Sequence, residues 1–223
     1  GVRHRSTIAP EALYLKAGID VTRPTDIRAS LTQRCNYKCL QCGCWRMKPK
    51  DEMTVEEWIT GLESLHQFLG WYCIQFSGGE PFVKKGFLEI LEFCSRRGID
   101  FGVITNGSAF GSRRLAERFV ATGPMKLEIS VDGPTAELHD GLRGIPGSLK
   151  SIEAGIRNLV EARRAAGRTF PIRIKATLNA LNFRTAPEIV RWARRHGATS
   201  VDFEPLREWT DETRNDLSPS AQD

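Results

Sequence analysis

Short apolar runs alternate with longer amphipathic runs along most of the 223-residue chain. The short runs are rich in Ile, Val, Leu and Phe, which is typical of strands buried on both faces of a parallel sheet. Strands separated by helices indicate right-handed crossovers, and hence an α/β fold. Six strands are predicted: Ile27–Leu31, Tyr72–Phe76, Phe101–Ile104, Leu127–Ser130, Ile172–Leu178 and Ser200–Phe203.

The ends of several helices are marked by capping residues. Thr54 and Glu57 have the spacing of a capping box, and an amphipathic stripe follows them. Thr185 and Glu188 predict a second capping box. Glycine just beyond an amphipathic run is a common way to end a helix, and three glycines are expected to do so: Gly98, Gly167 and Gly197.

Polar or glycine-rich loops follow each of the first four predicted strands. They are Cys35–Cys42, Ser77–Pro81, Thr105–Gly107 and Asp132–Pro134. In a barrel of parallel strands, the reactive groups gather at the carboxyl ends of the strands. We therefore expect these four loops to meet at one mouth of a barrel.

Three cysteines in the first loop, Cys35, Cys39 and Cys42, have C-x3-C-x2-C spacing. Two interpretations are open. A structural zinc site needs four closed ligands, and Cys44 would be the fourth. An iron–sulfur cubane held by three thiolates keeps one iron open for a substrate or cofactor, and a single short loop with three cysteines favours this second interpretation.

The six cysteines do not favour a disulfide framework. The chain is long enough to fold without such cross-links, and crowding of cysteines into one loop is typical of cytosolic thiols that bind metal. We therefore expect a cytoplasmic protein. Cys73 and Cys94 lie in a predicted strand and helix, where free cysteine is usually a small buried apolar residue.

The net charge of +5 admits nucleic acid or an acidic substrate as a partner. The alternative is a set of solvated basic helix faces, which we favour because no nucleic-acid-binding motif accompanies the charge. The apolar runs are too short to span a membrane, and no signal peptide is evident at the amino terminus.

Taken together, these motifs resemble the radical SAM superfamily, over about residues 26–205. The cysteine loop resembles the cluster-binding motif of that family, and Gly78-Gly79-Glu80 resembles its GGE element. Further segments are similar to the branch of peptide-modifying and sulfatase-maturing enzymes, which is related to the SPASM and twitch enzymes: Ile104–Gly107, Ser130–Gly133, His139-Asp140 and Arg143-Gly144.

The resemblance implies a partial (β/α)6 barrel of the TIM type that binds a 4Fe–4S cluster and S-adenosyl-L-methionine. It also implies an enzyme in which one electron, from a donor such as flavodoxin or ferredoxin, cleaves the sulfonium. The resulting 5′-deoxyadenosyl radical abstracts a hydrogen atom from a peptide or, as the alternative, from a small molecule. The rival class is a non-catalytic module that binds zinc or an iron–sulfur cluster.

The resemblance also implies roles for single residues. Cys35, Cys39 and Cys42 would bind the cluster, and Gly78 and Gly79 would let the backbone approach the methionine moiety. The other implied cofactor contacts are Glu80 to the ammonium, Asn106 from the third strand, Ser130 to the ribose and Arg143 to the carboxylate. Taken alone, the GGE, Thr105–Gly107 and Asp132-Gly133 segments are also typical of simple turns.

Two features depart from the family pattern. The residue before the third cysteine is often aromatic and packs near adenine, but here it is Gln41, so that Tyr37 or Trp45 would have to replace it. Cys44 is additional, and it is a spectator, a fourth thiolate or a redox partner. No cysteine follows Cys94, so this chain shows no auxiliary cluster site. His139 and Asp140 are an acid–base pair or, as we favour, a support for Arg143.

Three regions are predicted: an amino-terminal segment at 1–25, the core barrel at 26–205, and a linker or last helix at 206–223. Leu217-Ser218-Pro219 is typical of a helix start, and we expect the natural protein to continue beyond it. Glu204 and Arg207 follow the sixth strand and are candidates for facing the substrate.

Overall fold

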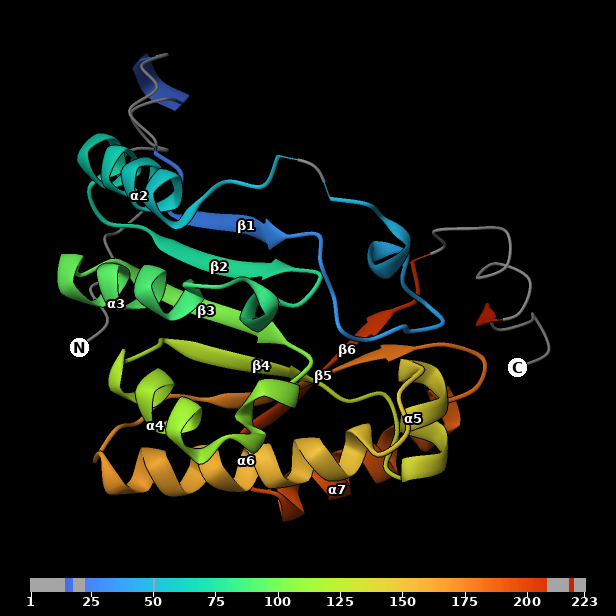
Figure 1. The fold of residues 1–223 in the computed structure, drawn as a ribbon. Helices are drawn as coiled ribbons and strands as arrows, with labels where there is room; N and C mark the ends of the chain where they lie inside the picture. Colours follow the sequence, from blue (N-terminus) through green and yellow to red (C-terminus); the bar gives the residue numbers. More distant parts are fainter. Residues whose placement is uncertain (1–14, 18–22, 50, 208–216, 219–223) are drawn as a thin grey trace.

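A single parallel sheet organises the chain, whose computed structural model describes residues 15–17, 23–49, 51–207 and 217–218. Neighbouring strands follow one another in sequence order and every pair is parallel (Figure 1). All six predicted strands are present, with ends within two residues of the prediction. They are β1 (Asp26–Thr32), β2 (Cys73–Gly78), β3 (Asp100–Thr105), β4 (Lys126–Ser130), β5 (Ile172–Leu178) and β6 (Ser200–Pro205).

Helices connect the strands and pack against one face of the sheet, as right-handed crossovers require. Figure 1 shows the strand arrowheads at one end of the molecule, where the loop after β1 runs toward α5. This places the four loops of interest at one end of the sheet. The helices are α2 (Val55–Leu69), α3 (Phe87–Arg97), α4 (Arg113–Ala121), α5 (Ala136–Arg143), α6 (Ser148–Ala165) and α7 (Ala186–Arg195).

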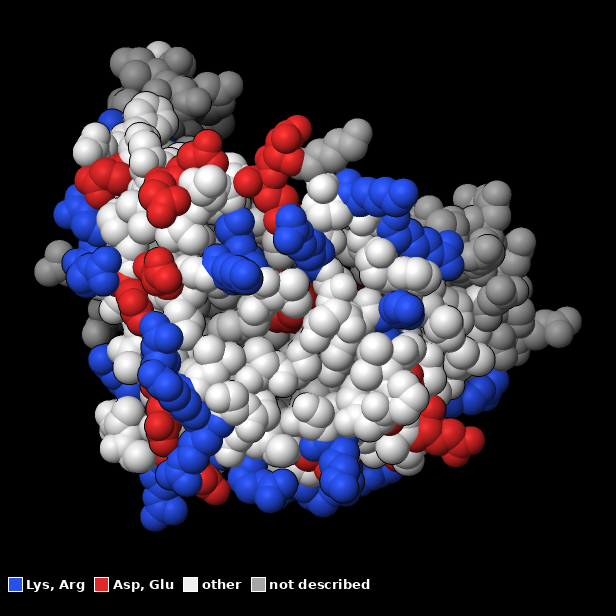
Figure 2. Space-filling model, in the orientation of Figure 1, with Lys and Arg blue, Asp and Glu red and all other residues white. Residues whose placement is uncertain are grey.

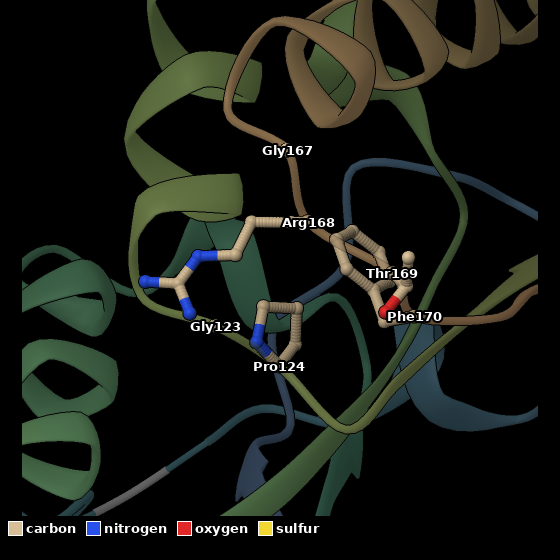
Figure 3. A pocket seen from close by; sticks show the side chains of 6 residues that line it. All are labelled: Gly123, Pro124, Gly167, Arg168, Thr169 and Phe170. Carbon is tan, nitrogen blue, oxygen red and sulfur yellow. The ribbon is translucent and has the colours of Figure 1, made fainter.

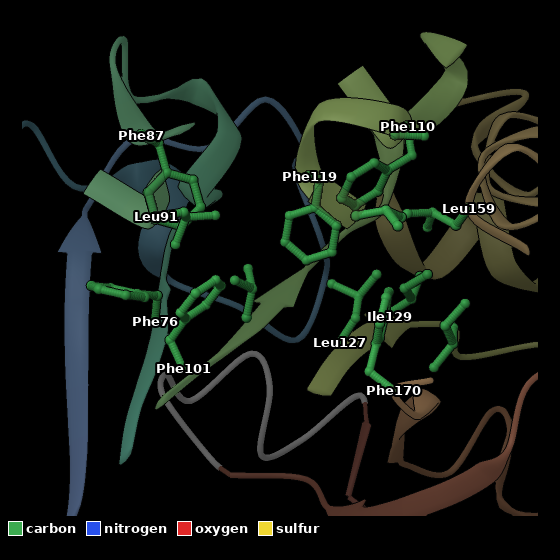
Figure 4. Packing of buried hydrophobic residues seen from close by; sticks show 14 of the residues in the cluster. Phe76, Phe87, Leu91, Phe101, Phe110, Phe119, Leu127, Ile129, Leu159 and Phe170 are labelled. Atoms are coloured by element: carbon green, nitrogen blue, oxygen red, sulfur yellow. The ribbon is translucent and has the colours of Figure 1, made fainter. Parts of the chain in front are cut away.

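The main core lies between the helices and the sheet and is rich in phenylalanine. Phe82 packs edge-to-face on Phe87 and Phe110, with ring centroids 5.2 and 4.8 Å apart. Phe119 continues the series, 5.2 Å from Phe110 and 6.3 Å from Phe170 (Figure 4). Such aromatic pairs add about 0.5–1.5 kcal/mol each beyond the area they bury.

The opposite face of the sheet carries polar side chains. Consecutive residues of β2, β3 and β4 are buried, as predicted for strands buried on both faces, whereas β5 departs from this expectation. On β5, burial alternates along the strand: Ile174 is fully buried, while Lys175 is partly exposed. On β4, Lys126 and Glu128 form an ion pair of 3.0 Å. Side chains alternate between the two faces of a strand, and the apolar side chains of the strands form one core cluster with residues of the helices.

The predicted helix ends are correct except at one helix. Thr54 and Glu57 form a reciprocal capping box, and Gly98 ends α3 with φ of 68°. The second capping box is wrong. Thr185 Oγ1 instead donates to the Asn182 carbonyl at 2.8 Å, because a 3-10 turn over Phe183–Thr185 leads into α7.

Gly167 and Gly197 follow α6 and α7 with φ of 58° and 82°. The predicted helix start at Ser218 depends on Pro219, which lies outside the described residues. Among the helices that the structure describes, none is long and apolar enough to cross a membrane.

Much of the basic charge lies on helix surfaces. Figure 2 shows Lys and Arg interspersed with Asp and Glu along the edges of one face. Arg97 of α3 pairs with Glu63 of α2 at 2.7 Å, and Arg118 of α4 pairs with Glu92 of α3 at 2.8 Å. This arrangement agrees with the interpretation of the charge as solvated helix faces.

Candidate functional site

The cysteine loop leaves β1 and is held by the loop that follows β2. The Gly79 N–H donates to the Thr32 carbonyl, and the Glu80 N–H donates to the Arg34 carbonyl, both at 2.8 Å. Gly78 has φ of 126°, and a Cβ at Gly79 would lie 2.2 Å from the Arg34 carbonyl oxygen. Glycine is therefore required here by the close packing of two protein loops.

Helix α5 holds the middle of the cysteine loop. The Lys38 and Leu40 N–H groups donate to the carbonyls of Arg143 and Leu142, at 3.3 and 2.9 Å. These carbonyls belong to the last turn of the helix, where no intrahelical donor reaches them. Gly144 ends the helix in the left-handed conformation, and a Cβ there would lie 2.4 Å from the Lys38 carbonyl oxygen.

The loop after β3 makes a third contact with the cysteine loop. Asn106 Nδ2 donates to Asn36 Oδ1 at 2.8 Å, and Asn36 Nδ2 donates to Ser108 Oγ at 3.0 Å. Asn106 is buried, and its own Oδ1 accepts the Ser108 N–H. The Asn106 side chain therefore links the two loops, whatever contact it makes with a cofactor.

Each of the three predicted cluster ligands has a hydrogen-bond donor at its sulfur. The Tyr37 N–H donates to Cys35 Sγ and the Cys44 N–H donates to Cys42 Sγ, both at 3.4 Å. Arg143 Nη1 lies 3.8 Å from Cys39 Sγ. Donors at sulfur stabilise the thiolate, which is the form that binds metal.

Burial opposes ionisation of two of these thiols. It raises the pKa of Cys35 to about 11 and raises the pKa of Cys39 against the opposing effect of Arg143. The Cys44 thiol is hydrogen-bonded to the Cys42 sulfur. This bond stabilises the Cys42 thiolate and the protonated Cys44, so it lowers the pKa of Cys42 and raises that of Cys44. Cys44 thus contacts a predicted ligand.

The donor set fits an iron–sulfur cluster, which thiolates with hydrogen bonds at their sulfurs typically hold. Three thiols lie in one loop, each with an N–H donor, and a buried guanidinium contributes positive charge beside the most buried thiol, Cys39. Within the part of the chain that the structure describes, no three His, Cys, Asp or Glu side chains are disposed as ligands of one metal ion.

Asp132, interpreted from the sequence as part of a turn, is the centre of a buried polar network. It is fully buried. Its Oδ2 accepts a hydrogen bond from Gln41 Nε2 at 2.5 Å and forms an ion pair with Arg143 Nε at 2.8 Å. Its Oδ1 accepts the Thr177 N–H at 2.9 Å, and its carbonyl accepts Asn182 Nδ2 at 2.8 Å.

Sequence reasoning missed Asp132, Gln41 and Asn182 as site residues. The only signal was the position of Asp132, two residues after the predicted contact Ser130 at the end of a buried strand. Gln41 stands where the family often has an aromatic residue, and its buried side chain bonds to Asp132. Tyr37 is buried and Trp45 Nε1 donates to the Cys39 carbonyl, so both lie at the cysteine loop, and packing of either against adenine stays a prediction.

The predicted ammonium contact, Glu80, is buried and bonded within the protein. Its Oε1 accepts from Thr105 Oγ1 at 2.8 Å and from the Phe82 N–H at 3.1 Å. Its Oε2 accepts the Asn106 N–H at 2.7 Å. Burial raises the pKa of Glu80 in spite of these donors. Glu80 therefore joins the loops after β2 and β3.

His139 and Asp140 bond to different partners: His139 contacts Asp132, which pairs with Arg143, whereas Asp140 contacts the start of α6. His139 Nδ1 accepts the Asp132 N–H at 3.2 Å, so its proton resides on Nε2. Asp140 accepts from Ser148 Oγ and the Leu149 N–H, at 2.7 and 2.8 Å. It thereby caps α6, whose N-cap residue Gly147 has no side chain.

The remaining candidates lie nearer to the surface. Ser130 is half-buried at the end of β4, beside Lys175 of β5. Glu204 forms an ion pair with Lys175 at 2.5 Å. Arg207 is exposed. The structure thus places Ser130 and Glu204 on the polar face of the sheet and leaves their predicted ligand contacts as predictions.

A pocket of about 260 Å³ lies at the other end of the sheet (Figure 3). It is formed where the chain enters β4 and β5, with Pro124 and Phe170 among its lining residues. Figure 3 shows the Arg168 side chain extending toward Gly123. The pocket is separate from the cysteine loop, which follows the carboxyl end of β1.

Comparison with known families and proteins agrees with this geometry. A family model described as the radical SAM superfamily matches residues 29–172. The chain belongs to the radical SAM superfamily. The family predicted from the cysteine and GGE motifs is therefore confirmed, and its known relatives are enzymes.

Several relatives of this radical SAM chain have been named. An AdoMet-dependent heme synthase of Methanosarcina barkeri is 29% identical over 179 residues, which are 79% of this chain and 49% of the relative. A GTP 3′,8-cyclase of Caulobacter vibrioides is 32% identical over 210 residues, which are 89% of this chain and 57% of the relative. The mycofactocin maturase MftC of Mycobacterium tuberculosis is 27% identical over 183 residues, which are 82% of this chain and 44% of the relative. The chain thus spans about half the length of the curated relatives that it matches.

A similar fold is found in SuiB of Streptococcus suis. The structure of SuiB bound to S-adenosylmethionine has a TM-score of 0.76 at 16% identity and covers 96% of this chain and 47% of that chain. SuiB bound to its precursor peptide SuiA gives a TM-score of 0.73 at 16% identity, with coverage of 92% and 44%. The predicted partial barrel of the radical SAM type is confirmed by this likeness of fold.

Proposed function

We propose that Cys35, Cys39 and Cys42 bind a 4Fe–4S cluster and that the protein is an S-adenosylmethionine-cleaving enzyme. When bound, the cluster would supply the single electron for cleavage of the cofactor's sulfonium, giving methionine and a 5′-deoxyadenosyl radical that would abstract a hydrogen atom from a substrate. The observation that carries this proposal is the thiol loop itself, with a donor at each sulfur, in a chain of the radical SAM superfamily.

The protein contributes orientation and exclusion of competing reactions. Gly78 and Gly79 bring the backbone after β2 to within hydrogen-bond distance of the cysteine loop, and we propose that this backbone borders the cofactor's methionine group. Glu80 and Asn106 brace the same region from within, and their contacts with the cofactor are part of the proposal.

Arg143 is proposed to bind the cofactor carboxylate. A guanidinium has five N–H donors in a fixed plane. Two of its nitrogens, Nε and Nη1, face Asp132 and Cys39, which orients the group beside the proposed cluster site. Ser130 is proposed as a ribose contact because it ends β4, two residues before Asp132.

A peptide substrate is favoured. The similar proteins include a mycofactocin maturase and SuiB, which was determined with a precursor peptide. A small molecule is the alternative, in view of the similar heme synthase and GTP cyclase. The polar face of the sheet suits a polar substrate, since Lys126, Glu128 and Lys175 are among its side chains.

A cytoplasmic location and an electron donor such as flavodoxin or ferredoxin complete the proposal. The cluster requires a reduced environment and a supply of single electrons, and small redox proteins of these two classes provide them. Membrane and nucleic acid are not proposed as partners.

The test is anaerobic reconstitution with iron and sulfide, followed by dithionite and S-adenosylmethionine, with 5′-deoxyadenosine measured by mass spectrometry. We expect 5′-deoxyadenosine from the wild-type protein and none from Cys39→Ala. Cys73→Ala is the matched control, because Cys73 is also a buried cysteine but lies in β2, outside the loop. Copurified zinc without a cluster, or a cluster without 5′-deoxyadenosine, would instead support the non-catalytic module.

A further inference from the structure

Asp132, Arg143 and Cys39 form a buried series of alternating charge. Arg143 Nε lies 2.8 Å from Asp132 Oδ2, and Arg143 Nη1 lies 3.8 Å from Cys39 Sγ. The Asp132 side chain is 0% exposed and that of Arg143 is 11% exposed. The guanidinium therefore stands between a carboxylate and a predicted cluster ligand, in a region shielded from water.

Asp132 is fixed by parts of the chain that lie outside the cysteine loop. Oδ1 accepts the Thr177 N–H of β5 at 2.9 Å. The Asp132 carbonyl accepts Asn182 Nδ2 at 2.8 Å, and the Asp132 N–H donates to His139 Nδ1 at 3.2 Å. A residue held at its backbone N–H, its carbonyl and its Oδ1 cannot follow a mobile arginine, so Asp132 determines where the guanidinium lies.

We infer that Asp132 is a positioning residue, which holds the Arg143 cation against the Cys39 thiolate and thereby raises the reduction potential of the cluster bound there. The inference rests on the proposed function for the presence of the cluster and goes beyond it in assigning a role to Asp132. A nearby cation stabilises the reduced cluster, which carries one more negative charge, and this effect is strong where water is excluded. Hydrogen bonds to cluster sulfurs act in the same direction.

The sign of one substitution separates positioning from simple charge compensation. Asp132→Asn removes a buried negative charge, which by itself would raise the potential. However, an asparagine has one acceptor oxygen, whereas the Asp132 carboxylate accepts the Thr177 N–H at one oxygen and faces Gln41 and Arg143 at the other. The asparagine NH2 group would meet another donor, so Arg143 would leave Cys39 and the potential would fall.

The experiment is a redox titration of the reconstituted protein in the absence of S-adenosylmethionine, with the reduced cluster monitored by electron paramagnetic resonance. We expect Asp132→Asn and Arg143→Gln each to lower the midpoint potential. At a fixed potential, the ratio of reduced to oxidised cluster should fall about tenfold in each variant. This corresponds to a shift in midpoint potential of about 59 mV for a one-electron couple. The double variant should have a potential no lower than that of Arg143→Gln alone, because the fall caused by Asp132→Asn requires Arg143.

Three further variants complete the design. Arg143→Lys keeps the charge and should restore part of the shift seen in Arg143→Gln. Arg97→Gln removes an arginine from an exposed pair with Glu63 and should leave the potential unchanged. Gln41→Leu removes one partner of Asp132 without changing the charge, and it replaces Asp132→Asn if that variant does not bind the cluster. Its expected shift is smaller and of the same sign.

A raised potential in Asp132→Asn, an unchanged potential in both single variants, or additive shifts in the double variant would overturn the inference. Failure of the proposed function has a different outcome. If the cluster forms with these shifts but no 5′-deoxyadenosine is produced, the role of Asp132 stands and the proposed reaction does not. If the wild-type protein binds no cluster, both fall.

Discussion

The Gln41 side-chain amide donates to Asp132 Oδ2 at 2.5 Å, between residues that are 91 positions apart in the sequence. Both residues are buried. Gln41 lies between two predicted cluster ligands, and Asp132 lies just beyond β4. This hydrogen bond therefore fastens the second half of the cysteine loop to the centre of the sheet.

Replacement of Gln41 should weaken the folded state in a way that depends on pH. Gln41→Leu removes one hydrogen bond to a buried carboxylate, which should lower the free energy of unfolding by about 1–3 kcal/mol. Gln41→Glu places a second carboxylate beside Asp132, so it should be more destabilising at pH 8 than at pH 5, where protonation relieves the repulsion. Urea unfolding of the metal-free protein at both pH values measures this. Equal costs of Gln41→Glu at the two pH values would contradict it.

The glycines of the GGE element should be intolerant of a methyl group. Gly79→Ala would place Cβ 2.2 Å from the Arg34 carbonyl oxygen. Overpacking of this kind costs about 1–3 kcal/mol and sometimes more, and it should also reduce the iron bound on reconstitution because Arg34 adjoins Cys35.

Gly43→Ala is the matched control for Gly79→Ala. Gly43 directly follows the cysteine loop with φ of −89°, and a Cβ there would lie more than 4 Å from any residue other than its neighbours in the chain. Thermal unfolding and iron content should be close to wild type in Gly43→Ala. Equal losses in the two variants would show that the loop tolerates no change, whatever the contact.

His139 should make stability depend on pH. Burial, with Arg143 adding to it, lowers the pKa of His139 from 6.5 to about 3. The unfolded chain therefore binds a proton that the folded protein does not, and stability falls as pH decreases from about 6.5 toward 3. The slope due to this one group approaches about 1.4 kcal/mol per pH unit.

The test of this linkage is denaturant unfolding of wild type and His139→Asn between pH 7 and pH 4. Asparagine retains an acceptor for the Asp132 N–H but does not titrate in this range. We expect the variant to be less stable at pH 7 and to lose less stability on acidification. An identical slope in both proteins would mean that His139 is protonated in the folded state.

Cys44 should be dispensable for the cluster. Cys44→Ala removes a partner of Cys42, but the Cys44 N–H that donates to Cys42 Sγ remains. Iron and sulfide per protein should therefore stay close to wild type, whereas Cys39→Ala should lose the cluster. Metal analysis and visible absorbance after anaerobic reconstitution decide this. An equal loss of metal in both variants would support the zinc site with Cys44 as its fourth ligand.

The arrangement of elements was accessible from the sequence because each signal is local. Apolar runs specified the strands, and the alternation of strands with helices specified their parallel order. The cysteine loop and the GGE element fall at the ends of consecutive strands, so their proximity followed from topology alone. Thr185 shows the limit of such local patterns, because the 3-10 turn before α7 removes the geometry that its capping box requires.

Only the tertiary structure decided which partners the polar side chains take. Glu80 and Asn106 were predicted to face a cofactor, and both have partners in neighbouring loops. Asp132 was interpreted as part of a turn, although Gln41 and Arg143 converge on it from distant segments. A buried polar group must find a partner wherever the fold supplies one. The sequence by itself thus determined the kind of chemistry and its place at the carboxyl ends of the strands, whereas the network that orients it depends on contacts across as many as 104 residues.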